Sequence, residues 1–162
     1  MRYMGGKAMI ARHIVTAILA DTPERGTWFE PFVGGGNVLE HAAPHFAKSV
    51  AMDAHEDLML MWQAVNAGWE PPPFVSREEY HGLRYAEPSA LRGFAGFGAS
   101  FGGKWFGGYA VSKIDKKHSV AEECRTAHKI VIRQGRVFRQ HNVSFAHEHF
   151  GSRTPEPGSV VH

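Results

Sequence analysis

The sequence has almost no cysteine and no long apolar run. Its 162 residues contain one cysteine, Cys124, which excludes an internal disulfide framework and is typical of a reducing compartment. No apolar run approaches the roughly 20 residues that a membrane-spanning helix needs. Residues 1–7 do not have the pattern of a secretory signal. These absences predict a cytoplasmic protein with no membrane partner.

Neither sign of charge dominates the composition. The formal net charge is +2, the sequence pI is about 8.8, and 43% of the residues are hydrophobic. A chain of this length and composition can form one domain with a real core, which excludes a disordered protein. The basic residues are nevertheless concentrated, with nine Lys or Arg against three acids in residues 104–139. That segment permits a nucleic-acid partner, although it could equally be an ordinary solvated helix face.

A metal-ligand pattern is also missing, despite eleven histidines. His41 and His45 are four residues apart on an expected helix, and His147 and His149 would share one face of a strand. Neither pair has a convincing third ligand, so we expect no metal site. Cys124 lies in an expected basic helix and is predicted to be a small core residue.

The first 70 residues show the alternation of strands and helices that is typical of a parallel sheet with crossover helices. Asn37 is the expected N-cap of the second helix, which Pro44 should end, and Gly68 should end the third. In chain order, the apolar spacing predicts a helix over 7–20, a strand over 27–33, a helix over 37–43, a strand over 49–53 and a helix over 55–67.

Beyond Gly68 the alternation breaks. Capping boxes at 76–79 and 119–122 predict two further helices, the second basic and ending near Gly135. Between them, residues 93–109 contain seven glycines and six aromatic residues, a composition typical of neither a linker nor an ordinary core element. Residues 142–145 could form a strand, and residues 157–162 have the pattern of a turn that enters another strand.

Three consecutive glycines follow the first predicted strand, in the stretch WFEPFVGGGNVLEHA over 28–42. Such a run is kept where the backbone must turn sharply or let a ligand come close. Asp53, nineteen residues after Gly34, is placed to accept hydrogen bonds from ribose hydroxyls at the end of the second strand. A dinucleotide fingerprint would need glycine where Leu39 stands. The pattern therefore favours a ligand that carries adenosine without a pyrophosphate.

These motifs resemble the Dam-type, D12 class of adenine-specific DNA methyltransferases, which use S-adenosylmethionine (AdoMet). Residues 3–7 (YMGGK) match the family's opening motif, residues 30–36 (EPFVGGG) match its AdoMet turn, and Asp53 matches its second-strand acid. The resemblance implies that the cofactor is bound by Tyr3, Gly6, Lys7, Glu30, Pro31, Phe32, Gly34, Gly36 and Asp53.

The resemblance also implies an α/β fold: a partial, doubly wound, Rossmann-like methyltransferase core with an inserted helical region that recognises DNA. Residues 1–70 would form the AdoMet-binding part, 71–139 the glycine- and aromatic-rich recognition region, and 140–162 the return to the sheet. Double-stranded DNA is the implied partner. The residues assigned to it are Lys104, Trp105, Tyr109, Lys113, Lys116, Lys117 and Arg133.

The family's catalytic motif, Asp-Pro-Pro-Tyr, occurs nowhere in these 162 residues, and His162 stands where it should begin. A flipped adenine has to be held by hydrogen bonds and stacking before it can be methylated. We therefore expect an incomplete adenine-N6 methyltransferase, with no catalytic residue assigned, that pairs with itself or with a chain carrying the motif. The alternatives are a non-catalytic AdoMet- or DNA-binding protein and, less consistent with Leu39, an unrelated nucleotide-binding enzyme.

Structural roles stay open for the assigned residues. Lys7 could be a solvated lysine of a first helical turn, Glu30 a buried acid bonded to local backbone, and Asp53 a cap for the following helix. Trp105 and Tyr109 could be core aromatics instead of base-stacking groups.

Overall fold

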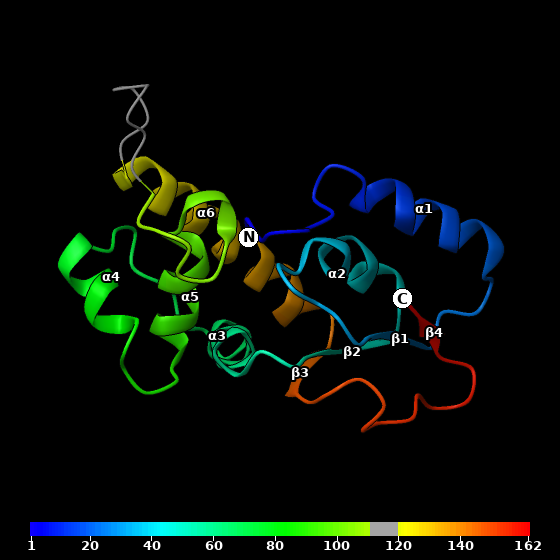
Figure 1. Ribbon diagram of the computed structural model, residues 1–162. Coiled ribbons are helices and arrows are strands. Elements are labelled where there is room, and N and C mark those ends of the chain that lie inside the picture. The colour runs from blue at the N-terminus through cyan, green and yellow to red at the C-terminus, as the bar shows by residue number, and fades with distance from the viewer. Residues whose placement is uncertain (111–119) are drawn as a thin grey trace.

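A four-stranded, all-parallel sheet forms the centre of the fold (Figure 1). The computed structural model describes residues 1–110 and 120–162. Its strands are β1 (Thr27–Glu30), β2 (Lys48–Asp53), β3 (Val143–His147) and β4 (Val160–Val161), in the order β3-β2-β1-β4. This arrangement confirms the predicted α/β fold and is consistent with a Rossmann-like methyltransferase sheet.

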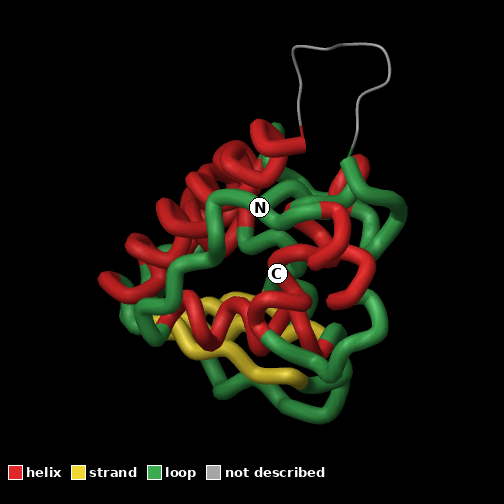
Figure 2. The backbone as a smooth tube through the Cα atoms, turned by 90° about the vertical axis from the view of Figure 1, so that its left-hand side faces the viewer, coloured by secondary structure: helices red, strands yellow, loops and turns green. Residues whose placement is uncertain are grey.

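The helices form two groups around this sheet. Helices α1 and α2 lie over its β1 and β4 side, while α4, α5 and the start of α6 gather beyond α3 (Figure 1). Figure 2 shows the strands beneath the helices, with α6 along one side. The α-helices are α1 (Ala11–Asp21), α2 (Asn37–Ala42), α3 (Glu56–Asn66), α4 (Arg77–Leu83), α5 (Ala90–Gly98) and α6 (Val120–Gln140), with short 3-10 turns η1 (Ala43–His45) and η2 (Phe101–Gly103).

Several predicted boundaries differ from the structure. Helix α1 begins at Ala11, because residues 7–10 form a turn closed by the Ile10 N–H donating to the Lys7 carbonyl. Strand β1 ends at Glu30, before Pro31, which has no N–H to continue a ladder. Asn37 is the first residue of α2, and Gly36 is its N-cap, with no side-chain capping bond. The capping box at 76–79 is confirmed, whereas the one at 119–122 lies partly outside the described residues.

The predicted helix end near Gly135 is wrong. Helix α6 continues to Gln140, and Gly135 is buried inside it. The reason is close packing, since a Cβ at this position would come within 2.4 Å of Val65 Cγ1 on α3. The glycine lets α3 and α6 approach each other, which brings α6 against the core. The division into 1–70, 71–139 and 140–162 stays a prediction, and α6 joins its first two parts through contacts with α2 and α3.

No helix in the described part of the chain is long and apolar enough to cross a membrane.

We expect Gly135→Ala to lower the free energy of unfolding by about 1–3 kcal/mol, because the new methyl group would overpack the α3–α6 contact. The control is Gly82→Ala on α4, where a Cβ meets nothing within 4 Å. That change should stabilise the protein by about 0.5–1 kcal/mol through helix propensity. Urea denaturation of both variants measures the difference, and equal effects would contradict the packing role.

Candidate functional site

The glycine turn after β1 has a backbone that other residues rarely adopt. Gly34 has φ 48° and Gly36 has φ 69°. A Cβ at Gly34 would lie 3.1 Å from the Tyr3 ring, and one at Gly36 would lie 3.1 Å from the Trp62 ring. The turn therefore needs glycine at both positions, for its dihedral angles and for its close neighbours.

Two buried side chains hold successive carbonyls of this turn. The indole N–H of Trp62 on α3 donates to the Gly34 carbonyl (3.0 Å), and the Gln134 amide on α6 donates to the Gly35 carbonyl (3.1 Å). Because the C=O and N–H of a trans peptide point in opposite directions, the first bond turns the Gly35 N–H away from Trp62. Among the described residues, nothing accepts a hydrogen bond from the Gly35 N–H. This donor is thus left for a ligand.

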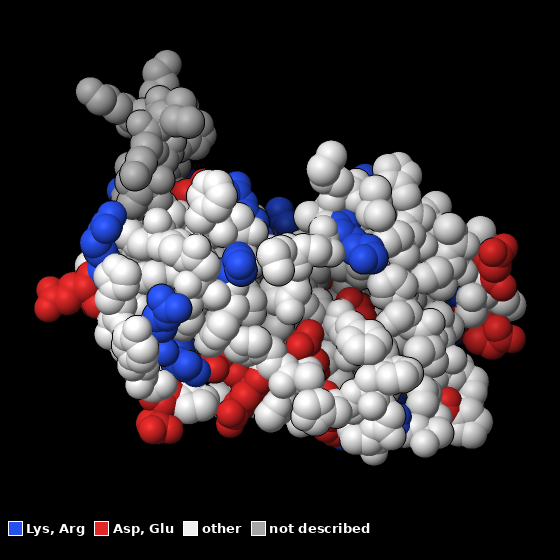
Figure 3. Space-filling view, viewed as in Figure 1, with Lys and Arg blue, Asp and Glu red and all other residues white. Residues whose placement is uncertain are grey.

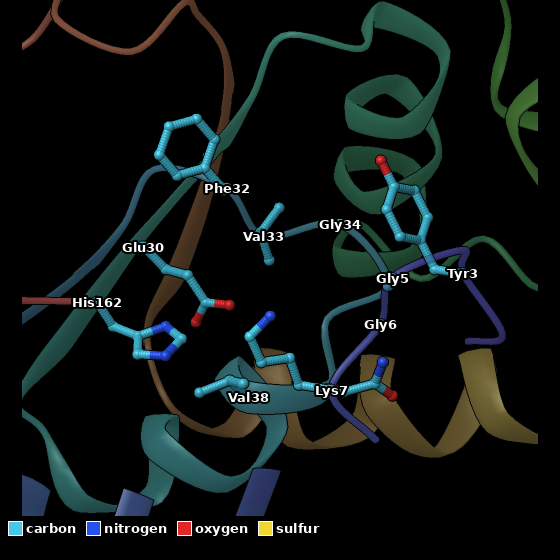
Figure 4. Close-up of a pocket in the computed structure, with 12 residues that line it drawn as sticks. Tyr3, Gly5, Gly6, Lys7, Glu30, Phe32, Val33, Gly34, Val38 and His162 are labelled. Carbon is cyan, nitrogen blue, oxygen red and sulfur yellow. The ribbon is translucent and has the colours of Figure 1, made fainter. Parts of the chain in front are cut away.

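A cavity of about 240 Å³ lies beside the turn. Most of its wall comes from two segments that are far apart in sequence, the N-terminal stretch 3–7 and the strand end and turn at 30–35. Figure 4 shows their side chains around the cavity. The sequence analysis assigned six of the lining residues to a cofactor: Tyr3, Gly6, Lys7, Glu30, Phe32 and Gly34. The others are Gly5, Val33, Gly35, Asn37, Val38 and His162.

Glu30 places a buried carboxyl in the cavity wall. Its side chain accepts a hydrogen bond from the Trp28 indole N–H (2.9 Å), and the residue is 2% exposed. Burial raises the pKa of Glu30 to about 8, partly offset by the Trp28 hydrogen bond. In Figure 4 the Lys7 amino group points toward this carboxyl. The structure thus presents a carboxylic acid that a cationic ligand would convert to a carboxylate.

His162 lines the cavity next to Glu30, on the side opposite Tyr3 (Figure 4). Its ring stacks on Trp28, with centroids 5.5 Å apart. Burial, and then the nearby Lys7 charge, lower the pKa of His162 below its ordinary value.

Three of the predicted cofactor residues do not line the cavity as it stands. Asp53 lies behind the turn, where one oxygen accepts the Gly34 N–H and the other the His55 N–H, both at 3.0 Å. The N-cap of α3 is His55, whose Nδ1 accepts the Leu58 N–H (3.4 Å), so Asp53 does not fill the capping role left open above. Gly36 packs on Trp62, and Pro31 is buried. Their assignment to the cofactor stays a prediction.

The predicted DNA-binding residues fall into four groups. Lys104 is exposed in the loop after η2. Trp105 and Tyr109 are half-buried: Trp105 packs on Phe97, and the Tyr109 hydroxyl donates to the Val75 carbonyl (2.6 Å). Arg133 is held by both oxygens of Glu40 on α2, at 2.6 and 2.9 Å. Three more, Lys113, Lys116 and Lys117, lie outside the described residues.

The glycine- and aromatic-rich segment is largely part of the core. Phe94, Phe97 and Phe106 are buried, and a Cβ at Gly96 would come within 2.2 Å of the Trp105 ring. Figure 3 shows a hollow between this helical region and α1, with basic side chains above it and acidic ones inside and below it. Among the described residues there is no cluster of three or more potential metal ligands.

Sequence reasoning missed Gln134, which is fully buried and bonded to the glycine turn. A signal for it exists in the helical spacing of α6. The buried positions of α6 follow one stripe at intervals of three and four residues: Cys124, Ala127, Val131, Gln134 and Phe138. Among these five, Gln134 is the strongly polar side chain.

Residues 3–82 match the family model of the D12 class N6 adenine-specific DNA methyltransferases. These 80 residues, just under half of the chain, are similar to the D12 class. No curated protein matches the chain. The match includes every residue predicted to bind the cofactor and ends within α4. Helix α6, with Gln134 and Arg133, lies outside the matched residues.

We expect Glu30→Gln to change how stability depends on pH. The folded protein keeps the Glu30 proton up to about pH 8, whereas the unfolded chain loses it near pH 4.5. The stabilisation that this proton gives is therefore complete below pH 4.5 and is lost as the pH rises toward 8. Glutamine keeps an acceptor for Trp28 and has no proton to lose.

Thermal unfolding of both proteins from pH 4.5 to 9 measures this effect. Wild type should lose melting temperature relative to the variant across that window, and the difference should level off above pH 8. Parallel curves would show that the Glu30 pKa is not raised.

Proposed function

We propose that this chain binds AdoMet in the cavity beside the glycine turn and supplies that site for adenine-N6 methylation of double-stranded DNA. The observation that carries the proposal is the convergence of residues 3–7 and 30–35 on one cavity, because both segments belong to the D12 match. The family generally uses AdoMet as its methyl donor.

The described residues fit such a cofactor in four ways. The Gly35 N–H has no protein acceptor, which leaves a backbone donor for the ligand. The Glu30 carboxyl can ionise against a positively charged group. Each Asp53 oxygen accepts one backbone N–H and keeps a lone pair for a ribose hydroxyl. Lys7 and Tyr3 form the wall that would close over the ligand.

AdoMet, when bound, supplies an electrophilic methyl group on a positively charged sulfur. The contribution of this chain would be alignment: the turn would hold the cofactor, and apolar walls such as Val33 and Val38 would exclude water. No residue in 1–162 corresponds to the Asp-Pro-Pro-Tyr groups that would hold the target adenine. We propose that a segment carrying those groups comes to lie beside β4, which is an edge strand of the described sheet.

Calorimetry with AdoMet and S-adenosylhomocysteine tests the cofactor site. We expect both to bind, and Asp53→Ala to weaken binding by about tenfold, because a hydrogen bond to a charged group is lost. The control is Glu56→Ala, an exposed acid three residues away. No heat from either compound with folded wild-type protein would overturn the proposal, and equal losses in the two variants would remove Asp53 from the site.

The missing acceptor motif favours a second candidate, a non-catalytic AdoMet- or DNA-binding protein. Methyl transfer to adenine-containing duplex DNA distinguishes the two, when it is assayed with this chain alone and with a chain that carries Asp-Pro-Pro-Tyr. Activity that appears only in the mixture supports the first function. Cofactor binding with no transfer in the mixture supports the second.

DNA binding is proposed through Lys104, Trp105, Tyr109 and Arg133, together with Lys113, Lys116 and Lys117. We expect duplex affinity to fall as salt rises, and Lys104→Gln to reduce the slope of log K against log salt by about 0.9, one phosphate contact. Lys48→Gln is the control, since Lys48 pairs with Glu156 at the start of β2. Fluorescence anisotropy at several salt concentrations measures both. A slope unchanged by Lys104→Gln would exclude this contact.

A further inference from the structure

Gln134 is a polar side chain in a position where an apolar one is expected. It is 0% exposed and lies on the buried stripe of α6 between Val131 and Phe138. Burying an amide without hydrogen bonds is costly, so its partners indicate why it is tolerated. One end of the Gln134 amide bonds to the glycine turn and the other to the Met1 amino group.

Three groups form this buried connection. The Gln134 Nε2 donates to the Gly35 carbonyl (3.1 Å), and the Met1 amino group donates both to that carbonyl (2.8 Å) and to Gln134 Oε1 (2.6 Å). Burial lowers the pKa of the Met1 amino group to about 5. The group is therefore neutral at pH 7, and no bare charge is buried with the glutamine. Because Gln134 also holds the amino group, both bonds to the Gly35 carbonyl depend on it.

These bonds fix the conformation of Gly35. The peptide plane before Gly35 is held by Trp62, which binds the Gly34 carbonyl. The plane after it contains the Gly35 carbonyl and the Gly36 N–H, which donates to the Val33 carbonyl (2.9 Å). Glycine can rotate freely about both of its backbone dihedrals, so two held planes are needed to set one conformation.

The neighbouring residue strengthens the same attachment. Arg133 binds both oxygens of Glu40, four residues after Gly36 on α2. On α6, Gln134 thus binds the turn and Arg133 binds α2, the helix that follows the turn. Helix α6 lies outside the D12 match, so the matched segment does not contain all the groups that shape its own turn.

We propose that Gln134 is a positioning residue: it holds the Gly35 carbonyl and, together with the Trp62 bond to the Gly34 carbonyl, sets the backbone conformation of the turn that lines the cavity and would bind the cofactor. The effect on cofactor affinity rests on the function proposed above. The effect on the turn does not, because it is a property of the ligand-free protein.

The test compares Gln134→Met with Val131→Ala. Methionine has a similar length and volume but cannot bond to the Gly35 carbonyl. Val131→Ala removes buried atoms about one turn away on the same stripe and leaves that carbonyl bonded. Selective 15N-glycine labelling follows the turn amides in the ligand-free protein, and calorimetry measures S-adenosylhomocysteine affinity well below both melting temperatures.

In Gln134→Met we expect the Gly35 and Gly36 amide signals to move, Gly36 exchange to accelerate at least tenfold, and affinity to fall about fivefold to tenfold. In Val131→Ala the melting temperature should fall while these amides and the affinity stay close to wild type.

Unchanged glycine amides in Gln134→Met would overturn the inference, whatever the cofactor does. Changed amides with unchanged affinity would limit Gln134 to a structural role and so overturn its role as a positioning residue. If wild type binds no AdoMet but the glycine amides still change in Gln134→Met, the proposed function fails, whereas the control of the turn by Gln134 is supported.

Discussion

The close approach of other groups to the glycine turn is the constraint on which the candidate site depends. The Tyr3 ring crowds Gly34, the Trp62 ring crowds Gly36, and at Gly35 a Cβ would meet the Met1 carbonyl at 2.7 Å. Any side chain in this run would push one of these neighbours away. The N-terminal segment could then no longer lie against the strand end, and the cavity between them would lose one of its walls.

Much of this arrangement is predictable from local sequence. Glycines that need positive φ, an acid at the end of the next strand and helical spacing are short-range signals, so the sheet, the helices α3 and α4 and six lining residues could be inferred before the structure. Glycines packed inside helices are ambiguous, because the sequence does not show what approaches them. From the sequence, Gly135 therefore predicted the end of a helix. In the structure it lies inside α6 and permits the close contact with α3.

The remaining features depend on contacts between distant parts of the chain. Helical periodicity could have flagged Gln134 as an irregular member of an apolar stripe, but not its partner, Gly35, 99 residues away. Arg133 matched the pattern of a phosphate contact, yet its guanidinium lies against Glu40, which local charge patterns do not reveal. Asp53 was correctly placed at the strand end, and only the three-dimensional structure shows that it also accepts the Gly34 N–H.

The sequence distance between Gly35 and Gln134 has a consequence for the order of folding. Contacts between distant residues close large loops, which makes them slow to form compared with a helix or a local turn. Strands β1 and β2 and helix α2 can begin to assemble from nearby residues. The Gly35 carbonyl, like the pairings of β3 and β4, needs residues that come after the whole helical region. We therefore expect the Gly36 amide to gain protection from hydrogen exchange during refolding no earlier than α6 docks.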